Sequence, residues 1–205
     1  MSLQAVFARI AQIDEIVSPR PPAASTATGT SGFLSALDGA QHSSALAAPA
    51  AAPTLGAGTA GQGALAAAQA EVGVAEQPPG SNDGPRIAEY RTATAGSAVG
   101  PWCAYFTSWC ASQAGVPLGE VGQGFGSVDA LYGWAQRTGR ATPAGQGVAP
   151  NPGDLIVWGG RHIGIVESVD PDGSIHTIEG NSSNAVSRRT YGPDGGGATG
   201  YVRLG

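Results

Sequence analysis

Residues 151–169, NPGDLIVWGGRHIGIVESV, mark the change in sequence pattern that decides the fold class. The turn residues NPGD are followed by two apolar runs, DLIVW and HIGIVESV, which Gly159, Gly160 and Arg161 separate. Short apolar runs bounded by Gly, Pro and Asp are typical of strands joined by turns. Three similar runs follow before the C-terminus: SIHTIEG, NAVSRRTY and GYVRL. We therefore expect an antiparallel sheet in the last third of the chain.

Upstream of this point the pattern is helical. Pro85 and Ser127 are suited to helix starts, and Gly115 and Gly139 to helix ends. The helices are expected at about 64–73, from Pro85, at 102–115 and at 127–139. Helices that precede a run of strands favour an α+β fold, with helices packed on one face of the sheet.

The first part of the chain differs from this globular region. Residues 1–18 place apolar side chains at steps of three and four, which predicts an amphipathic helix for docking or targeting. Packing against a neighbouring domain is the alternative. Residues 19–58 are rich in Pro, Ala, Ser and Gly, so we expect a disordered tether. Residues 59–205 are expected to form the globular domain.

Composition excludes some classes of function. The chain has a net charge of −5 and no Lys among its ten basic residues, so no basic stripe for nucleic acid is expected. No apolar run approaches the roughly 20 residues of a membrane span. The N-terminus lacks the basic and continuous apolar regions of a Sec signal. We expect a monomer without cofactor.

The two cysteines lie in PWCAYFTSWC, residues 101–110. On a helix, Cys103 and Cys110 would be about 10 Å apart along the axis, too far for a disulfide. Their spacing also differs from that of zinc ligand pairs, and no metal site is expected. At a helix start, free N–H groups favour a thiolate and can hold an oxyanion, which suits Cys103 as a nucleophile. Taken alone, Cys103 is better explained as a core residue, because free cysteines are among the most buried residue types.

A partner histidine would favour the nucleophile. His42 lies in the tether, and His176 reads as a surface or satisfied strand histidine. His162 begins the run HIGIVESV, beside small residues that leave space around it. Adjacent antiparallel strands would bring the end of SIHTIEGN beside His162, so Glu179 or Asn181 can orient its imidazole. The sequence thus predicts a site of Cys103, His162, Glu179 and Asn181.

Other residues near these motifs are candidates for substrate contact. Trp102 and Tyr105 flank Cys103 and could form walls of a groove, although core packing is an equal alternative. Trp158 is interpreted mainly as core packing. Asn82, in the turn-rich segment PPGSNDG, could border the cleft.

Four segments resemble the CHAP family of cysteine-dependent amidohydrolases and peptidases. Three carry its core motifs: GPWCAYFTSWCASQAGVP, NPGDLIVWGGRHIGIVESV and HTIEGNSS. A fourth, EVGVAEQPPGSNDGPRIAEYR, resembles its lead-in region. The resemblance implies a papain-like fold, Cys103 as nucleophile, His162 as general base, Glu179 as its orienting residue and Asn181 as a further polar member. It also implies cleavage of peptidoglycan, as N-acetylmuramoyl-L-alanine amidase or peptide endopeptidase.

The N-terminus resembles that of flagellum-associated wall hydrolases, through VFARIAQIDEIV and GFLSALDGA. This implies a flagellar or secretion-apparatus partner for residues 1–18, and export from the cytoplasm to the cell wall by a route other than Sec. The alternatives are a phage-type endolysin, a secreted antibacterial effector, a small-amide hydrolase of the same fold, or a non-catalytic wall-binding module.

Overall fold

The structure is a computed structural model that describes residues 59–145 and 147–205. The amphipathic helix predicted for residues 1–18 and the tether predicted for 19–58 lie outside the described residues. In the part that is described, no helix has the length and apolar character that crossing a membrane would require.

The helical half contains α3, α4, α5 and α6. Pro85 occupies the first turn of α4, where its missing N–H costs no hydrogen bond. Ser127 caps α6 as expected, because its Oγ accepts a hydrogen bond from the N–H of Ala130 at 3.3 Å. The helices span Thr59–Ala70 (α3), Pro85–Arg91 (α4), Cys103–Gln113 (α5) and Val128–Arg137 (α6).

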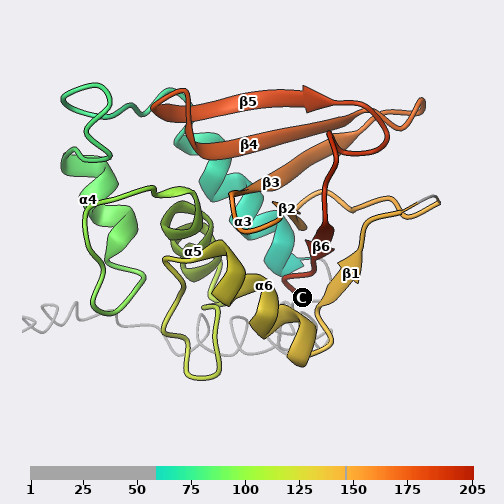
Figure 1. The fold of residues 1–205 in the computed structure, drawn as a ribbon, viewed down its shortest axis with the longest axis horizontal. Helices are drawn as coiled ribbons and strands as arrows, with labels where there is room; N and C mark the ends of the chain where they lie inside the picture. The colour runs from blue at the N-terminus through green and yellow to red at the C-terminus, as the bar shows by residue number, and fades with distance from the viewer. Residues whose placement is uncertain (1–58, 146) are drawn as a thin grey trace, which may run out of the picture. The chain divides into compact units, whose positions relative to one another are not determined.

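The strands form one antiparallel sheet with the order β1-β6-β2-β3-β4-β5 (Figure 1). Consecutive strands from β2 to β5 are neighbours, so tight turns suffice to connect them. The strands span Ala141–Pro143 (β1), Leu155–Trp158 (β2), His162–Val169 (β3), Ile175–Ser182 (β4), Ala185–Tyr191 (β5) and Gly200–Val202 (β6).

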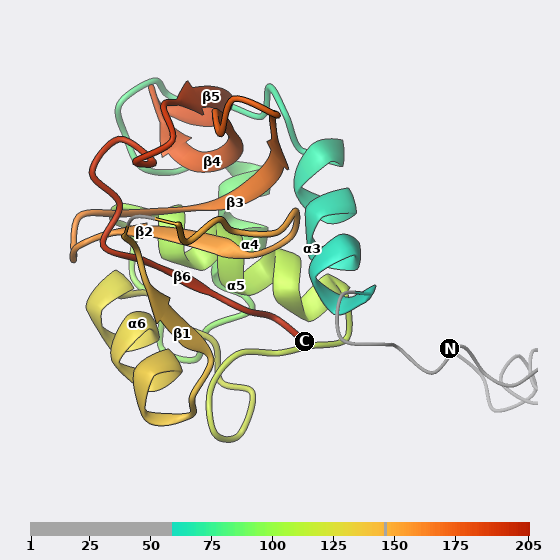
Figure 2. The same ribbon diagram turned by 90° about the vertical axis from the view of Figure 1, so that its right-hand side faces the viewer.

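Helix α5 lies against β3 and β4, with α3 beside it (Figure 2). Its buried residues occur on most of its circumference, so it is the central helix of the core. Gly180 on β4 makes the close approach possible: a Cβ there would lie 2.6 Å from Cβ of Phe106 on α5. The contact brings the helix start and the end of β4 to the same region of the molecule.

The expected α+β fold is confirmed, with helices packed against an antiparallel sheet. Two details differ from expectation. Helix α3 starts at Thr59 and ends at Ala70, earlier than the segment 64–73. The three-residue edge strand β1 was not expected, because so short a strand has no periodic pattern of its own.

Candidate active site

Cys103 is the first residue of α5, and Trp102 is the residue that precedes it as N-cap. The carbonyl of Trp102 already accepts a hydrogen bond from the N–H of Phe106, at 2.9 Å. The first N–H groups of a helix have no partner within it, and together with the helix dipole they attract negative charge. The Cys103 thiol therefore lies at the end of α5 that carries the free N–H groups, and only 5% of the residue is exposed.

Cys110 has a different environment on the same helix. It is fully buried, and burial raises the pKa of its thiol well above the ordinary value. Both cysteines are free, as their spacing predicted. Cys110 is therefore a small apolar core residue, while Cys103 is the thiol at the helix start.

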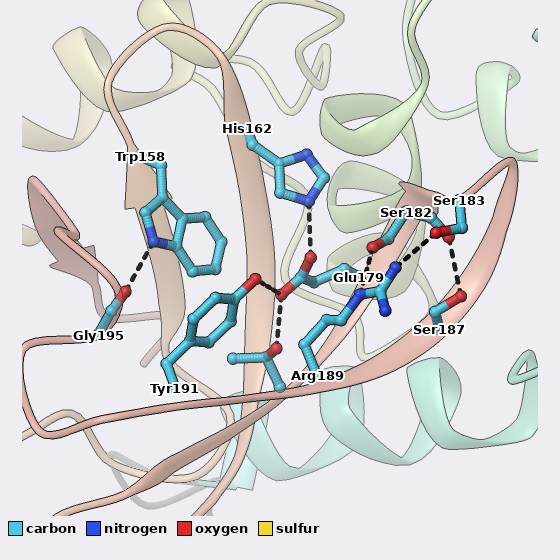
Figure 3. Close-up of polar contacts among 10 residues, drawn as sticks. Trp158, His162, Glu179, Ser182, Ser183, Ser187, Arg189, Tyr191 and Gly195 are labelled. Carbon is cyan, nitrogen blue, oxygen red and sulfur yellow. Dashed lines mark hydrogen bonds and ion pairs between the residues drawn. The ribbon is translucent and has the colours of Figure 1, made fainter.

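His162 is the first residue of β3, paired with Trp158 across the turn from β2. The two rings stack, with centroids 5.6 Å apart and planes at 27°. Trp158 is itself fixed, because its Nε1 donates a hydrogen bond to the carbonyl of Gly195 at 2.7 Å (Figure 3). The imidazole therefore has one face covered and a restricted orientation.

Glu179 on β4 contacts His162 directly: its Oε2 is 2.8 Å from Nε2 of the imidazole (Figure 3). The carboxylate is almost fully buried. Neighbouring β3 leaves space for it at Gly164, where a Cβ would lie 2.7 Å from Cγ of Glu179. Of the two residues that the sequence offered as orienters, the structure thus places Glu179 on the imidazole.

The second carboxylate oxygen of Glu179 is also occupied. Its Oε1 accepts hydrogen bonds from Oγ1 of Thr177, at 2.6 Å, and from the hydroxyl of Tyr191, at 2.8 Å (Figure 3). Sequence analysis did not identify either donor. Thr177 lies two residues before Glu179, on the same face of β4, so the strand period was a usable signal. No feature of the sequence pointed to Tyr191, which lies at the end of β5.

These contacts act on the protonation of His162. Burial lowers its pKa, but the nearby Cys103 and the hydrogen bond and charge of Glu179 outweigh this effect and raise the pKa to about 9. Because Nε2 bonds to Glu179, Nδ1 is the ring nitrogen left for the thiol. The hydrogen bond joins His162 to Glu179, and Cys103 lies near enough to raise the pKa of the imidazole.

Glu179 stays ionised in this group. Burial raises its pKa, but hydrogen bonds from His162, Thr177 and Tyr191 outweigh that effect, and the pKa falls below the usual value. A buried carboxylate next to a histidine of raised pKa favours an imidazolium at neutral pH. That cation can pair with a thiolate of Cys103.

Asn181 lies near the group but has a different partner. Its Nδ2 donates a hydrogen bond to Oδ1 of Asn82, at 2.9 Å. Both asparagines have left-handed backbones, with φ of 57° and 55°. Asn181 lines a cavity of about 420 Å³. The residues around this cavity are Trp158, Arg161, His162, Glu179, Asn181, Ser182, Ser183, Tyr191 and Gly196.

The aromatic candidates for substrate contact lie inside the fold. Trp102 is fully buried, and its Nε1 donates a hydrogen bond to Oε1 of Glu76 at 2.9 Å. The interpretation of Trp102 as a groove wall therefore gives way to core packing, because it has no surface to offer. Tyr105 is half-buried and packs against the core, with Gly126 against its ring. Asn82 is half-buried, and the bond to Asn181 occupies its Oδ1.

The remaining histidine of the described region is part of the sheet surface. His176 accepts or donates hydrogen bonds with Asp170, at 2.8 Å, and Thr190, at 3.0 Å. It is a satisfied strand histidine, as predicted, and takes no part in the group around Cys103. Residues 59–145 and 147–205 contain no cluster of three His, Cys, Asp or Glu that could hold a metal ion.

Comparison with protein families gives one match: residues 94–181 fit the model of the CHAP domain. The matched segment contains Cys103, His162, Glu179 and Asn181, together with Trp102 and Tyr105, whereas Asn82 precedes it. No curated protein matches the chain.

The solved structures that are similar to this chain include the following two. One is a mutated form of the Resuscitation Promoting Factor Interacting protein RipA, with 18% identity and a TM-score of 0.41 over 71% of this chain. This chain covers 62% of that protein's chain. The other is the peptidoglycan hydrolase RipB from Mycobacterium tuberculosis, with 18% identity and a TM-score of 0.42, over 99% of this chain and 86% of the other. The family model thus describes residues 94–181 more specifically than either solved structure does.

Proposed function

Because this chain carries a CHAP domain at residues 94–181, we propose that it is a hydrolase that cleaves amide bonds of bacterial cell-wall peptidoglycan. Cys103 is the nucleophile, His162 the general base and acid, and Glu179 the residue that orients His162.

The observation that carries the proposal is the hydrogen-bonded group around His162. The imidazole contacts Glu179 at 2.8 Å, and its interactions with Cys103 and Glu179 raise its pKa to about 9. A charged imidazole beside a thiol at a helix start is the arrangement that activates a cysteine for attack on a carbonyl.

The reaction divides into two halves. The thiolate of Cys103 attacks the amide carbon, and the N–H of Cys103 at the start of α5 holds the oxyanion. His162 gives its proton to the leaving amine, and a thioester remains on Cys103. Neutral His162 then takes a proton from water, whose oxygen attacks the thioester. The carboxylic acid leaves, and the thiolate and imidazolium are restored.

The cavity beside this group suits a polar, extended substrate. Its walls offer the hydroxyls of Ser182 and Ser183, the amide of Asn181 and the guanidinium of Arg161. Within the described residues, Arg161 forms no ion pair with a carboxylate. Peptide stems rich in carboxylates and amides fit these groups. Cleavage next to muramic acid and cleavage within the peptides are both compatible with them.

The proposal also includes a role for the N-terminal region. A flagellar or secretion-apparatus partner for residues 1–18, and export by a route other than Sec, remain predictions from the sequence. The endolysin, the effector and the small-amide hydrolase would use the same chemistry at Cys103. The substrate distinguishes the small-amide hydrolase, and toxicity on periplasmic expression distinguishes the effector.

The test is mass spectrometry of the fragments that the full chain and its Cys103→Ala variant release from purified peptidoglycan. Fragments that depend on Cys103 would support a wall hydrolase. Their new ends would identify the bond, since free lactyl groups indicate an amidase and new amino-acid termini an endopeptidase. Cys110→Ala is the matched control and should keep most of the activity. Absence of Cys103-dependent fragments from several wall chemotypes would contradict the proposal.

A further inference from the structure

Glu76 is a buried acid outside the catalytic group, in the segment between α3 and α4. Only 2% of it is exposed, and within residues 59–145 and 147–205 it forms no ion pair. A buried carboxylate without a cation is costly unless hydrogen bonds compensate it. Its backbone N–H donates to the carbonyl of Asn184, at 2.9 Å, which fixes the residue against the turn between β4 and β5.

One carboxylate oxygen holds the start of the nucleophile helix. Oε1 of Glu76 accepts the hydrogen bond from Nε1 of Trp102, at 2.9 Å. Trp102 is fully buried and is the N-cap of α5, directly before Cys103. A displacement of the Trp102 ring would therefore move the backbone that carries the thiol.

The other oxygen connects to the strand that carries the acid of the catalytic group. Oε2 of Glu76 accepts from the backbone N–H of Asn82, at 3.0 Å. The side chain of Asn82 in turn accepts from Nδ2 of Asn181, at 2.9 Å. Asn181 follows Glu179 by two residues on β4 and lines the cavity beside His162.

Resting on the proposed function, we propose that Glu76 is a positioning residue that fixes the helix bearing Cys103 relative to the end of β4 bearing Glu179. Cys103 lies on α5, His162 on β3 and Glu179 on β4. No backbone hydrogen-bond ladder joins α5 to β4, so side chains must hold the helix in place against the strand. Misplacement of reacting groups by about 1 Å can reduce a rate a hundredfold. The buried carboxylate of Glu76 accepts hydrogen bonds from Trp102 and from Asn82, and so limits how far α5 can move relative to β4.

The alternative is that Glu76 contributes only to stability. Glu76→Gln distinguishes the two, because the amide keeps the shape but offers one acceptor oxygen where two donors point at it. The readout is the rate of Cys103 alkylation by iodoacetamide between pH 5 and pH 10, together with fragment release and thermal unfolding. Alkylation reports how the thiol and His162 interact and requires no peptidoglycan, so it remains informative if the proposed substrate is wrong.

Glu71→Gln is the matched control. Glu71 is also a buried acid of this region, but its hydrogen bonds are with Arg86 and Tyr90, and it has none with Trp102 or Asn82. Its loss should lower the unfolding temperature and leave the alkylation profile unchanged. Glu76→Gln should slow alkylation at pH 7 by about tenfold or more, and fragment release by up to roughly a hundredfold, well below its unfolding temperature.

A second variant covers the case in which Glu76→Gln does not fold. Asn82→Gly removes only the side-chain bond to Asn181, and glycine accepts the φ of 55° without strain. It should fold and should slow alkylation severalfold. A folded Glu76→Gln with the wild-type profile would overturn the proposal. If Glu76→Gln does not fold, an unchanged profile for Asn82→Gly would overturn it.

Discussion

Gly164 and Glu179 face each other on β3 and β4, and the missing side chain of Gly164 gives the Glu179 carboxylate its place behind His162. A Cβ at position 164 would lie 2.7 Å from Cγ of Glu179, closer than two carbon atoms can approach. The pairing of β3 with β4 thus places the Glu179 carboxylate beside Gly164, which follows His162 by two residues on β3.

Gly164→Ala should therefore reduce activity through Glu179. The added methyl group must push the carboxylate away from the imidazole, because neighbouring strands fix both backbones. We expect fragment release from peptidoglycan to fall between about tenfold and a hundredfold. Gly133→Ala, on α6, is the control, since its Cβ would meet only Arg137 at 3.5 Å. Equal activity of the two variants would show that the position of the Glu179 carboxylate does not affect the reaction.

Glu179→Gln should change the pH dependence of the reaction. Glu179 is one of the groups that raise the pKa of His162 to about 9, so loss of its charge should let the imidazole lose its proton at lower pH. The alkaline limb of the rate profile should move from near pH 9 toward neutrality, and the rate at pH 7 should fall roughly a hundredfold. Initial rates of fragment release from pH 5 to pH 10 measure both. An alkaline limb unmoved in the variant would argue against this role.

Strand pairing explains why much of this group could be predicted. His162 begins one strand and Glu179 ends the next, and an antiparallel pair brings those ends together whatever the details of the turn. Cys103 was identified from its place at a helix start. These inferences need only neighbouring elements of the chain, and the helix-to-strand change at NPGD gave their order.

Contacts between residues that are far apart in the sequence explain what could not be predicted. The sequence left Trp102 open between a groove wall and core packing, because it does not tell which side of the helix start meets Tyr90 and Glu76. Tyr191 reaches Glu179 only through the register of β4 and β5, which shifts between Glu179 and Ser182. A shift of one residue would turn Tyr191 to the other face of the sheet.

The raised pKa of His162 also predicts how stability depends on pH. Folding raises that pKa from an ordinary value of 6.5 to about 9, so the folded state binds this proton more tightly than the unfolded state. The resulting stabilisation is fully present below pH 6.5 and is lost as the pH rises from there through about 9. Glu179, whose pKa is lowered, changes protonation only in the acid range, outside this window.

Comparison with His162→Ala removes the contributions of the titrating groups that His162 does not contact. The difference in unfolding temperature between wild type and variant should be largest near pH 6 and should shrink by at least about 2–4 °C by pH 10, the change that about 1 kcal/mol produces in a domain of this size. Thermal unfolding followed by circular dichroism at half-unit pH steps measures it. A difference that stays constant across the window would show that folding does not raise the pKa of His162, and the imidazolium required to protonate the leaving amine would lose its physical basis.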